Sequence, residues 1–216
     1  MSRIFGVIVL TLVLVRSVSA QDIPLEPLKV SSNVSFGYNA SILYPGLRGG
    51  IEYPINRIYL TKYRGRRPDR HYSKFRYLSA ELGYYHHPTF HDNIYFLTGW
   101  RTRRHHPNRY FKEFSSGMGF SRTFLGSETY TVDPNGNISL VKCSGYNYLL
   151  FAVGGGFGYT LPSKISAFMR NSILLMIPSN NLVYLRPTIE LGLNWRPVNF
   201  LKATIRNVSK LKGHKA

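Results

Sequence analysis

The sequence predicts an all-β fold: a closed, antiparallel transmembrane β-barrel of about eight strands that follows an N-terminal signal peptide. Three observations support this prediction. Apolar and polar residues alternate along most of the chain, which is the period of a strand. The alternating segments form an even set separated by turn residues such as Pro45-Gly46 and Pro162-Ser163. After the N-terminus, no apolar run approaches the length of about 20 residues that a membrane-spanning helix needs.

The N-terminal residues 1–20 have the pattern of a secretory signal. Arg3 provides a positive start, residues 4–15 are apolar, and Val18-Ser19-Ala20 is a small-residue cleavage pattern. A membrane anchor is the alternative, but Arg16 ends the apolar run well short of a bilayer-spanning length. Residues 21–32, with two prolines, are predicted to be a linker before a barrel at 33–197 and a basic C-terminal tail at 198–216.

The clearest predicted strand covers residues 183–196. Leu185, Ile189 and Leu191 belong to one face of it, whereas Arg186 and Glu190 belong to the other. Its length exceeds the usual five or six residues of a soluble strand and suffices for a tilted membrane strand, which needs about 9 to 11. The full set of alternating segments is 34–44, 47–58, 75–86, 93–104, 110–124, 147–161, 164–177 and 183–196.

The polar faces of these segments carry charged residues of both signs, and the apolar faces carry almost none. In a narrow membrane barrel the polar face points into the lumen, where carboxylates require cations as partners. We therefore predict a lumen plugged by a charge network rather than a water-filled pore. The alternative is a soluble lipocalin-like barrel with the faces reversed. The predicted network contains Arg48, Glu52, Glu81, Arg101, Arg103, Glu113, Arg170, Arg186 and Glu190.

The net charge of +18 becomes +16 if Arg3 and Arg16 leave with the signal peptide. Such a charge suggests nucleic acid in a cytosolic protein, but export argues against that partner. We expect instead contacts with outer-membrane lipid, with lipopolysaccharide phosphates, and with a protein partner in the envelope. The single cysteine, Cys143, excludes a disulfide within the chain.

A family resemblance rests on the Ala20-Gln21 junction, on the stretch Tyr44-Pro45-Gly46 to Gly50-Ile51-Glu52-Tyr53, and on the glycine-rich aromatic strands. With these features the chain resembles the small outer-membrane β-barrel proteins of Bacteroidetes, which are similar in shape to the OmpA barrel. The resemblance covers about residues 32–197. It implies a barrel located in the bacterial outer membrane, and it assigns no catalytic residues to this chain.

The C-terminal tail departs from that family, whose members commonly end on an aromatic residue of the last strand. Leu201, Ile205, Val208 and Leu211 have helical spacing among basic residues. One interpretation is a basic amphipathic segment on the membrane surface, and the other is a solvated, frayed tail.

Histidines are enriched between His71 and His106, and such a cluster could bind zinc or supply a general base. The predicted strands separate this set, so that only His86, His87 and His91 could converge, with Asp92 beside them. Outer-membrane lipid A deacylases resemble one another in a His-x-Ser-Asn pattern, for which this chain has only His86-His87-Pro88-Thr89. We predict no catalytic residue, no metal site and no cofactor, and regard the three histidines as loop residues.

The function expected from the sequence is a structural, assembly or docking role in the bacterial envelope, performed by a barrel without a pore. Two alternatives remain open at this stage. One is a lipid A-modifying hydrolase that uses the loop histidines, and the other is a soluble exported barrel that binds an apolar ligand.

Overall fold

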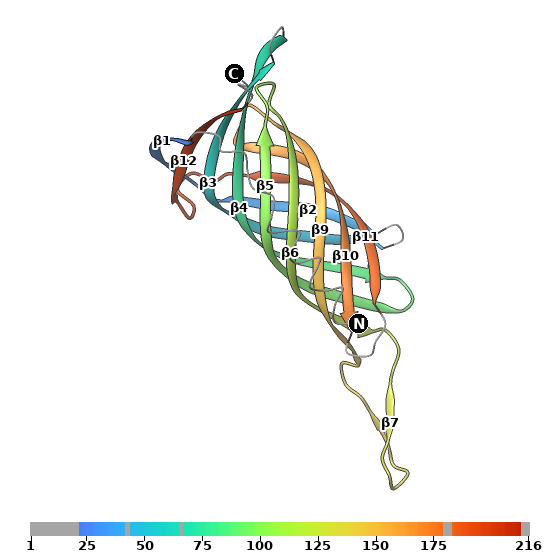
Figure 1. The fold of residues 1–216 in the computed structure, drawn as a ribbon. Coiled ribbons are helices and arrows are strands. Elements are labelled where there is room, and N and C mark those ends of the chain that lie inside the picture. Colours follow the sequence, from blue (N-terminus) through green and yellow to red (C-terminus); the bar gives the residue numbers. More distant parts are fainter. Residues whose placement is uncertain (1–21, 42–43, 65–66, 179–182, 213–216) are drawn as a thin grey trace, which may run out of the picture.

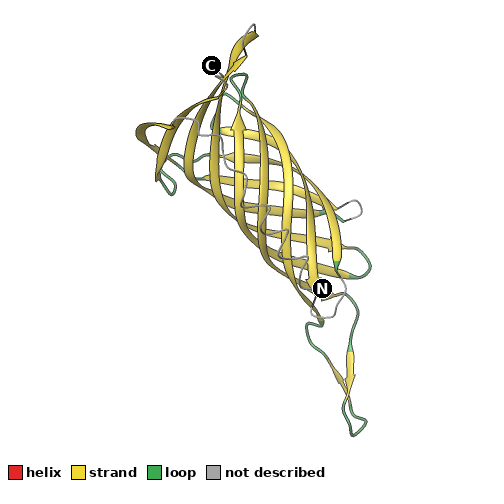
Figure 2. Ribbon diagram, in the orientation of Figure 1, coloured by secondary structure: helices red, strands yellow, loops and turns green. Residues whose placement is uncertain are grey.

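The computed structural model describes residues 22–41, 44–64, 67–178 and 183–212, so the predicted signal peptide lies outside the described residues. All regular elements in these ranges are strands, which confirms the all-β prediction (Figure 2). Within the same ranges, the chain contains no helix of the length and hydropathy needed to cross a membrane. The strands are β1 Asp22–Val30, β2 Asn33–Ser41, β3 Gly46–Arg64, β4 Arg67–His87, β5 His91–His105, β6 Tyr110–Leu125, β7 Tyr130–Val132, β8 Ile138–Leu140, β9 Gly145–Thr160, β10 Ile165–Pro178, β11 Tyr184–Trp195 and β12 Ala203–Lys212.

Antiparallel hydrogen-bond ladders connect β2 through β6 and β9 through β11. Each strand pairs with its neighbour in this series, β6 pairs with β9, and β11 pairs with β2. β3 pairs with both β2 and β4. The strands run obliquely around a common interior (Figure 1). Each of the eight alternating segments predicted from the sequence coincides with one strand of this series.

β3 and β4 extend beyond the other strands at one end of the molecule. β2 pairs only with the part of β3 from Leu47 to Glu52, whereas β12 pairs in parallel with β3 from Asn56 to Lys62. The β3–β4 ladder has a register shift at Pro54, where β3 passes from one partner to the other. Here β1 and β12 form a side sheet that continues the extension of β3 (Figure 1). We call this end, which carries β1 and β12, the terminal end.

The predicted linker at 21–32 is wrong for the residues that form β1. This strand pairs antiparallel with β12, from Asp22 opposite Lys210 to Val30 opposite Ala203. Pro24 and Pro27 suggested a linker, but β1 lies at the end of the sheet order and pairs with one strand only. Proline lacks an N–H donor and is tolerated in such an edge strand.

The predicted helical or frayed tail is likewise wrong for the residues of β12. Ala203 and Ile205 are buried and alternate with exposed Thr204 and Arg206, as in a strand. These two apolar residues pack in one cluster with Val30, Phe75 and Tyr77. The stabilising partners come from segments distant in sequence, so local spacing could not distinguish a short strand from a helix.

Side chains in the connected strands alternate between a crowded interior and an exposed exterior. In β11, Arg186, Thr188 and Glu190 are buried, whereas Ile189 and Leu191 are about half exposed. Glycines on the interior face make room for bulky neighbours. A Cβ atom on Gly158 would lie 2.3 Å from the ring of Phe111, and one on Gly83 would lie 2.0 Å from the ring of Tyr95.

The segment between β6 and β9 contains a separate hairpin, β7–β8, that projects from the end opposite the terminal end (Figure 1). Its tip is the Asp133-Pro134-Asn135-Gly136 turn, in which Gly136 has a φ of 85°. The Asp133 carboxylate accepts hydrogen bonds from the backbone N–H groups of Asn135 and Asn137 at 2.9 and 2.8 Å. This side chain therefore closes the turn.

We predict that acid loosens this hairpin tip. The hydrogen bonds from Asn137 and Asn135 hold the pKa of Asp133 below its ordinary value of 3.8. A depressed pKa in the folded state means that the stabilisation is present above pH 3.8 and is lost as the pH falls through the lower folded-state pKa. Protection of the Asn135 and Asn137 amides from hydrogen exchange should fall in this range. An Asp133→Asn variant should lack the pH dependence, and equal profiles in both proteins would contradict the prediction.

Candidate functional site

The four glutamates predicted to face inward come from four different strands and lie in the interior. Glu52 on β3 is 0% exposed, and Glu81 on β4, Glu113 on β6 and Glu190 on β11 are also buried. Four arginines of the predicted set, Arg48, Arg101, Arg103 and Arg170, are buried beside them. Strand alternation brings these charges together because each occupies an inward position of its own strand.

We call these eight residues the ion-pair cluster. Glu52 is its centre, since it accepts from Arg101, from Arg103 at 2.9 Å and from Arg170 at 3.0 Å. Asn33 donates to the second oxygen of Glu52 at 2.9 Å. The other pairs are Arg48 with Glu81 at 2.9 Å and with Glu190 at 3.2 Å, Arg103 with Glu113 at 2.8 Å, Arg170 with Glu190 at 3.3 Å, and two closer contacts, Arg101 with Glu81 and Arg170 with Glu113.

The cluster is electrically balanced, with four guanidinium groups and four carboxylates. Charges buried away from water are tolerated only when each has oppositely charged, hydrogen-bonded partners. Every member meets at least two partners of opposite sign. The planar fork of arginine suits this role because it can bridge carboxylates from different strands.

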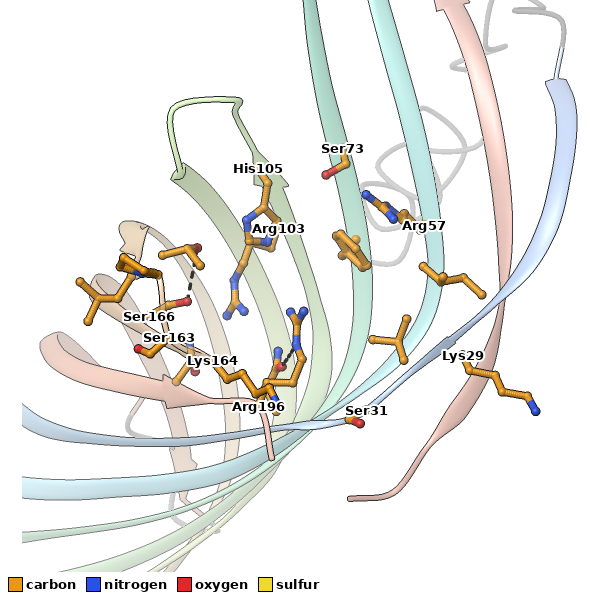
Figure 3. Close-up of a pocket in the computed structure, with 18 residues that line it drawn as sticks. Lys29, Ser31, Arg57, Ser73, Arg103, His105, Ser163, Lys164, Ser166 and Arg196 are labelled. Atoms are coloured by element: carbon orange, nitrogen blue, oxygen red, sulfur yellow. Dashed lines mark hydrogen bonds between the residues drawn. The ribbon is translucent and has the colours of Figure 1, made fainter. Parts of the chain in front are cut away.

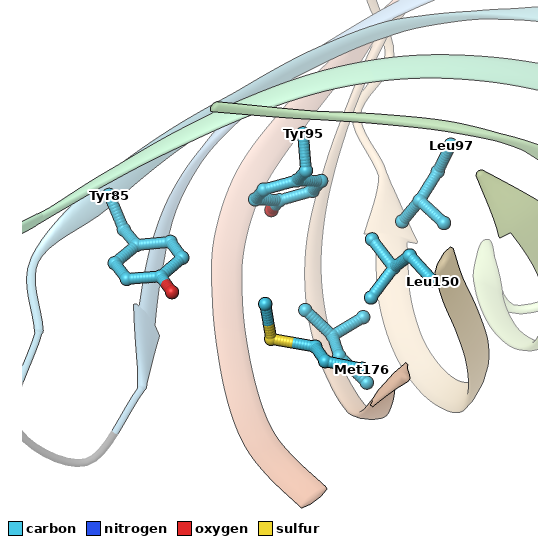
Figure 4. Close-up of a cluster of buried hydrophobic side chains, with 6 residues drawn as sticks. Tyr85, Tyr95, Leu97, Leu150 and Met176 are labelled. Atoms are coloured by element: carbon cyan, nitrogen blue, oxygen red, sulfur yellow. The ribbon is translucent and has the colours of Figure 1, made fainter. Parts of the chain in front are cut away.

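The prediction that Arg186 belongs to the charge network is wrong, because its side chain lies apart from the ion-pair cluster. Its guanidinium carbon is 3.2 Å from the centre of the Tyr85 ring. Among the residues that the structure describes, no carboxylate lies within ion-pairing distance of it. Tyr85 belongs to a buried apolar cluster with Tyr95, Leu97, Leu150, Leu174 and Met176 (Figure 4).

Asn33 belongs to the site, although the sequence prediction did not include it. It donates to Glu52 and accepts a hydrogen bond from Arg196 Nε at 3.0 Å, which connects the cluster to the terminal end. The register places Asn33 opposite Glu52 in the β2–β3 ladder. The sequence contained a clue to this position. Asn33 continues the polar alternation of the segment that follows it, so it belongs to the same face of the strand as those polar residues.

The three candidate histidines lie at the opposite rim, around the β4–β5 turn, where the structure brings His87 and His91 together and leaves His86 on the other face of β4. His86 is paired with Asp92 at 2.6 Å, and the Tyr84 hydroxyl donates to the same carboxylate at 2.9 Å. His87 lies opposite His91, with ring centres 5.2 Å apart. Within the described part of the chain, no group of three or more potential ligands is arranged to hold a metal ion. The arrangement is a His–Asp pair, and its described hydrogen bonds include no serine or cysteine that could serve as a nucleophile.

Comparisons with known proteins give matches among solved structures alone. No protein-family model matches the sequence, and no curated protein matches it. The chain is similar to the N-terminal β-barrel domain of Pseudomonas aeruginosa OprF, with 11% identity and a TM-score of 0.40, over 78% of this chain and 100% of that one. It is also similar to Neisserial surface protein A, with 13% identity and a TM-score of 0.37, over 78% of this chain and 96% of that one. The Yersinia pestis outer membrane protein Ail has 13% identity and a TM-score of 0.36, over 78% of this chain and 99% of that one.

Proposed function

We propose that the chain is an outer-membrane protein whose connected strands form a closed, eight-stranded transmembrane barrel with a structural or docking role in the bacterial envelope. The observation that carries this proposal is the inverted distribution of polarity. Charged side chains are buried in the interior, and large apolar side chains cover the exterior. Water disfavours this arrangement on both counts, whereas a hydrocarbon surrounding favours it. The same distribution argues against the lipocalin-like alternative.

The exterior apolar surface extends over all the connected strands. Exposed fractions reach 60% for Phe36, 59% for Leu82, 70% for Phe120 and 55% for Leu191. A soluble monomer rarely exposes a contiguous apolar patch larger than a few hundred Å². Lipid acyl chains would cover this surface without requiring a protein partner.

Aromatic residues toward the terminal end give the exterior a second feature of membrane barrels. Tyr53, Trp100, Tyr159 and Trp195 project outward from β3, β5, β9 and β11, each between 41% and 53% exposed. Tyrosine and tryptophan favour the membrane–water interface, where the ring meets lipid and the polar atom meets water. These residues would mark one boundary of the membrane.

The ion-pair cluster determines whether ions or solutes could pass through the interior of such a barrel. Arg101, Arg103, Glu52 and Glu190 are each at most 2% exposed, so their side chains fill the interior rather than line an aqueous path. A barrel of eight strands is just wide enough to be filled by its own side chains. We therefore propose a plugged barrel, which leaves a structural or docking role rather than diffusion of solutes.

Two measurements test the proposal. In planar bilayers the purified protein should give no discrete conductance steps, and regular steps would contradict a plugged lumen. In lipid vesicles the two tryptophans should be quenched by lipids brominated near the headgroup more than by lipids brominated at the acyl-chain end. Absence of quenching by any brominated lipid, with extraction into carbonate, would contradict a membrane location.

The hydrolase alternative depends on the His86–Asp92 pair. A general base oriented by a carboxylate is part of a Ser/His/acid site, but the nucleophile is the group that forms the covalent intermediate. When the protein is produced in bacterial cells that do not otherwise contain this protein, we expect the mass spectrum of their lipid A to stay unchanged. Loss of an acyl chain would replace our proposal with the enzymatic one.

A further inference from the structure

The terminal end contains a cavity of about 670 Å³ that the proposed structural role does not use. It lies beside the ion-pair cluster and is bordered by β1, by β3 to β5, by the β9–β10 turn and by the end of β11 (Figure 3). Its volume is within the range of small-molecule sites, roughly 300–1,000 Å³, and barrel mouths are a common place for such sites. We call it the mouth cavity.

The lining of the mouth cavity combines cationic and apolar side chains. The guanidinium groups of Arg57, Arg103 and Arg196 and the uncharged imidazole of His105 lie around the same space, whereas the Lys29 side chain points away from it (Figure 3). Among the described residues that line the cavity, none is Asp or Glu. The apolar lining residues are Leu28, Val30, Phe75, Leu161 and Pro162.

Most of this positive charge is not neutralised by the protein. Arg103 is paired with Glu52 and Glu113, but Arg57 and Arg196 have no carboxylate partner among the described residues. Burial lowers the pKa of Arg57, which lies in the extension of β3 outside the proposed membrane-spanning part, and the nearby Arg196 lowers it further. Two guanidinium groups that repel each other would both gain from a bound anion.

Several polar atoms of the residues that line the cavity are buried and lack a hydrogen-bond partner within the described chain. They are Nε of Arg57, Nε2 of His105, and both the amide nitrogen and oxygen of Asn194. Asn194 is only 3% exposed. Native proteins seldom leave buried polar groups unsatisfied, because each costs the free energy of its lost hydration. Of these atoms, Nε of Arg57 and the amide nitrogen of Asn194 are hydrogen-bond donors, and donors of this kind fit a ligand that supplies acceptor oxygens.

We propose that the mouth cavity binds the phosphate group of an amphiphilic molecule. The phosphate oxygens lie between Arg57 and Arg196, within reach of His105, and the apolar part of the ligand packs on Leu28, Val30 and Phe75. Arginine suits phosphate because its fork makes paired hydrogen bonds to two oxygens. The chemistry is shared by an anionic phospholipid headgroup and by free phosphate, and the apolar residues of the lining favour the lipid.

The test uses the refolded protein in nonionic detergent, titrated by calorimetry with three probes. Dihexanoyl phosphatidic acid carries both phosphate and short acyl chains, inorganic phosphate lacks the chains, and dihexanoylglycerol lacks the charge. We expect saturable binding of phosphatidic acid at one site and at least tenfold weaker binding of inorganic phosphate. Equal binding of both anions would assign the site to a free phosphate. Equal binding of the neutral glyceride, or no binding of either anion, would overturn the proposal.

Variants locate the site. The double variant Arg57→Gln, Arg196→Gln should bind phosphatidic acid about tenfold more weakly or worse, because charge-assisted hydrogen bonds are lost. Arg206→Gln is the matched control, since Arg206 is an exposed arginine on β12 at the same end and does not line the cavity. Unchanged affinity in the double variant, or equal loss in the control, would overturn the proposal. If the double variant fails to fold, the same comparison is made with Arg57→Gln alone, because Nε of Arg57 has no hydrogen-bond partner among the described residues.

Discussion

Replacing Glu52 by glutamine is expected to lower the free energy of unfolding by about 3–5 kcal/mol. Glu52 is fully buried and accepts from Arg101, Arg103 and Arg170. Glutamine has nearly the same shape but carries no charge, so the substitution leaves an excess positive charge in the interior. The expected cost therefore arises from stranded guanidinium groups rather than from a cavity.

The matched control for this prediction is Glu26→Gln. Glu26 is an exposed residue of β1 with no ion pair among those formed by the described residues, so its substitution should change stability by no more than about 0.5 kcal/mol. Unfolding by guanidinium chloride in lipid vesicles, followed by the fluorescence of Trp100 and Trp195, measures both variants. A double variant, Glu52→Gln with Arg103→Gln, restores charge balance and should recover part of the loss. Equal stability of the Glu52 and Glu26 variants would show that the ion-pair cluster contributes nothing.

Replacing Leu191 by arginine is expected to destabilise the membrane-embedded protein by about 2–4 kcal/mol. Leu191 projects from β11 with 55% of its surface exposed, among other large apolar side chains of the exterior. If lipid surrounds this surface, the substitution places a charge in hydrocarbon. If water surrounds it, the same substitution removes an unfavourable apolar contact with solvent and costs nothing.

Leu140→Arg provides a control with the same residue type and nearly the same exposure. Leu140 is 50% exposed and lies in β8 of the projecting hairpin, beyond the connected strands (Figure 1). We expect no measurable effect on unfolding in vesicles, because this side chain meets water in either case. A neutral effect of Leu191→Arg would contradict the orientation on which the proposed membrane location depends.

These two predictions address opposite faces of the same strands. The Glu52 substitution tests whether the interior depends on charge balance, and the Leu191 substitution tests what surrounds the exterior. A soluble barrel with an internal ion-pair cluster would be sensitive to the first and insensitive to the second. The proposed outer-membrane barrel is sensitive to both.

Residue alternation alone determined much of this structure. Side chains of a strand alternate between its two faces, so the polarity of each position predicted the strand and the direction of its side chain. All eight predicted segments coincide with strands, and Glu52, Glu81, Glu113 and Glu190 lie in the interior. The association of four glutamates with four arginines follows from this placement, because buried carboxylates require cations.

Tertiary structure alone decided the features that depend on distant partners. Residues 22–30 and 203–212 are strands because each is the other's neighbour in the sheet, which no local pattern reveals. Arg186 occupies an inward position of β11, like the residues of the ion-pair cluster. Its position along the barrel axis, however, places it over Tyr85 rather than beside Glu190. The position of a residue along this axis depends on the tilt and register of the strands, which the hydrogen-bond ladders set. The mouth cavity has the same origin, since its lining residues come from segments that only the folded chain brings together.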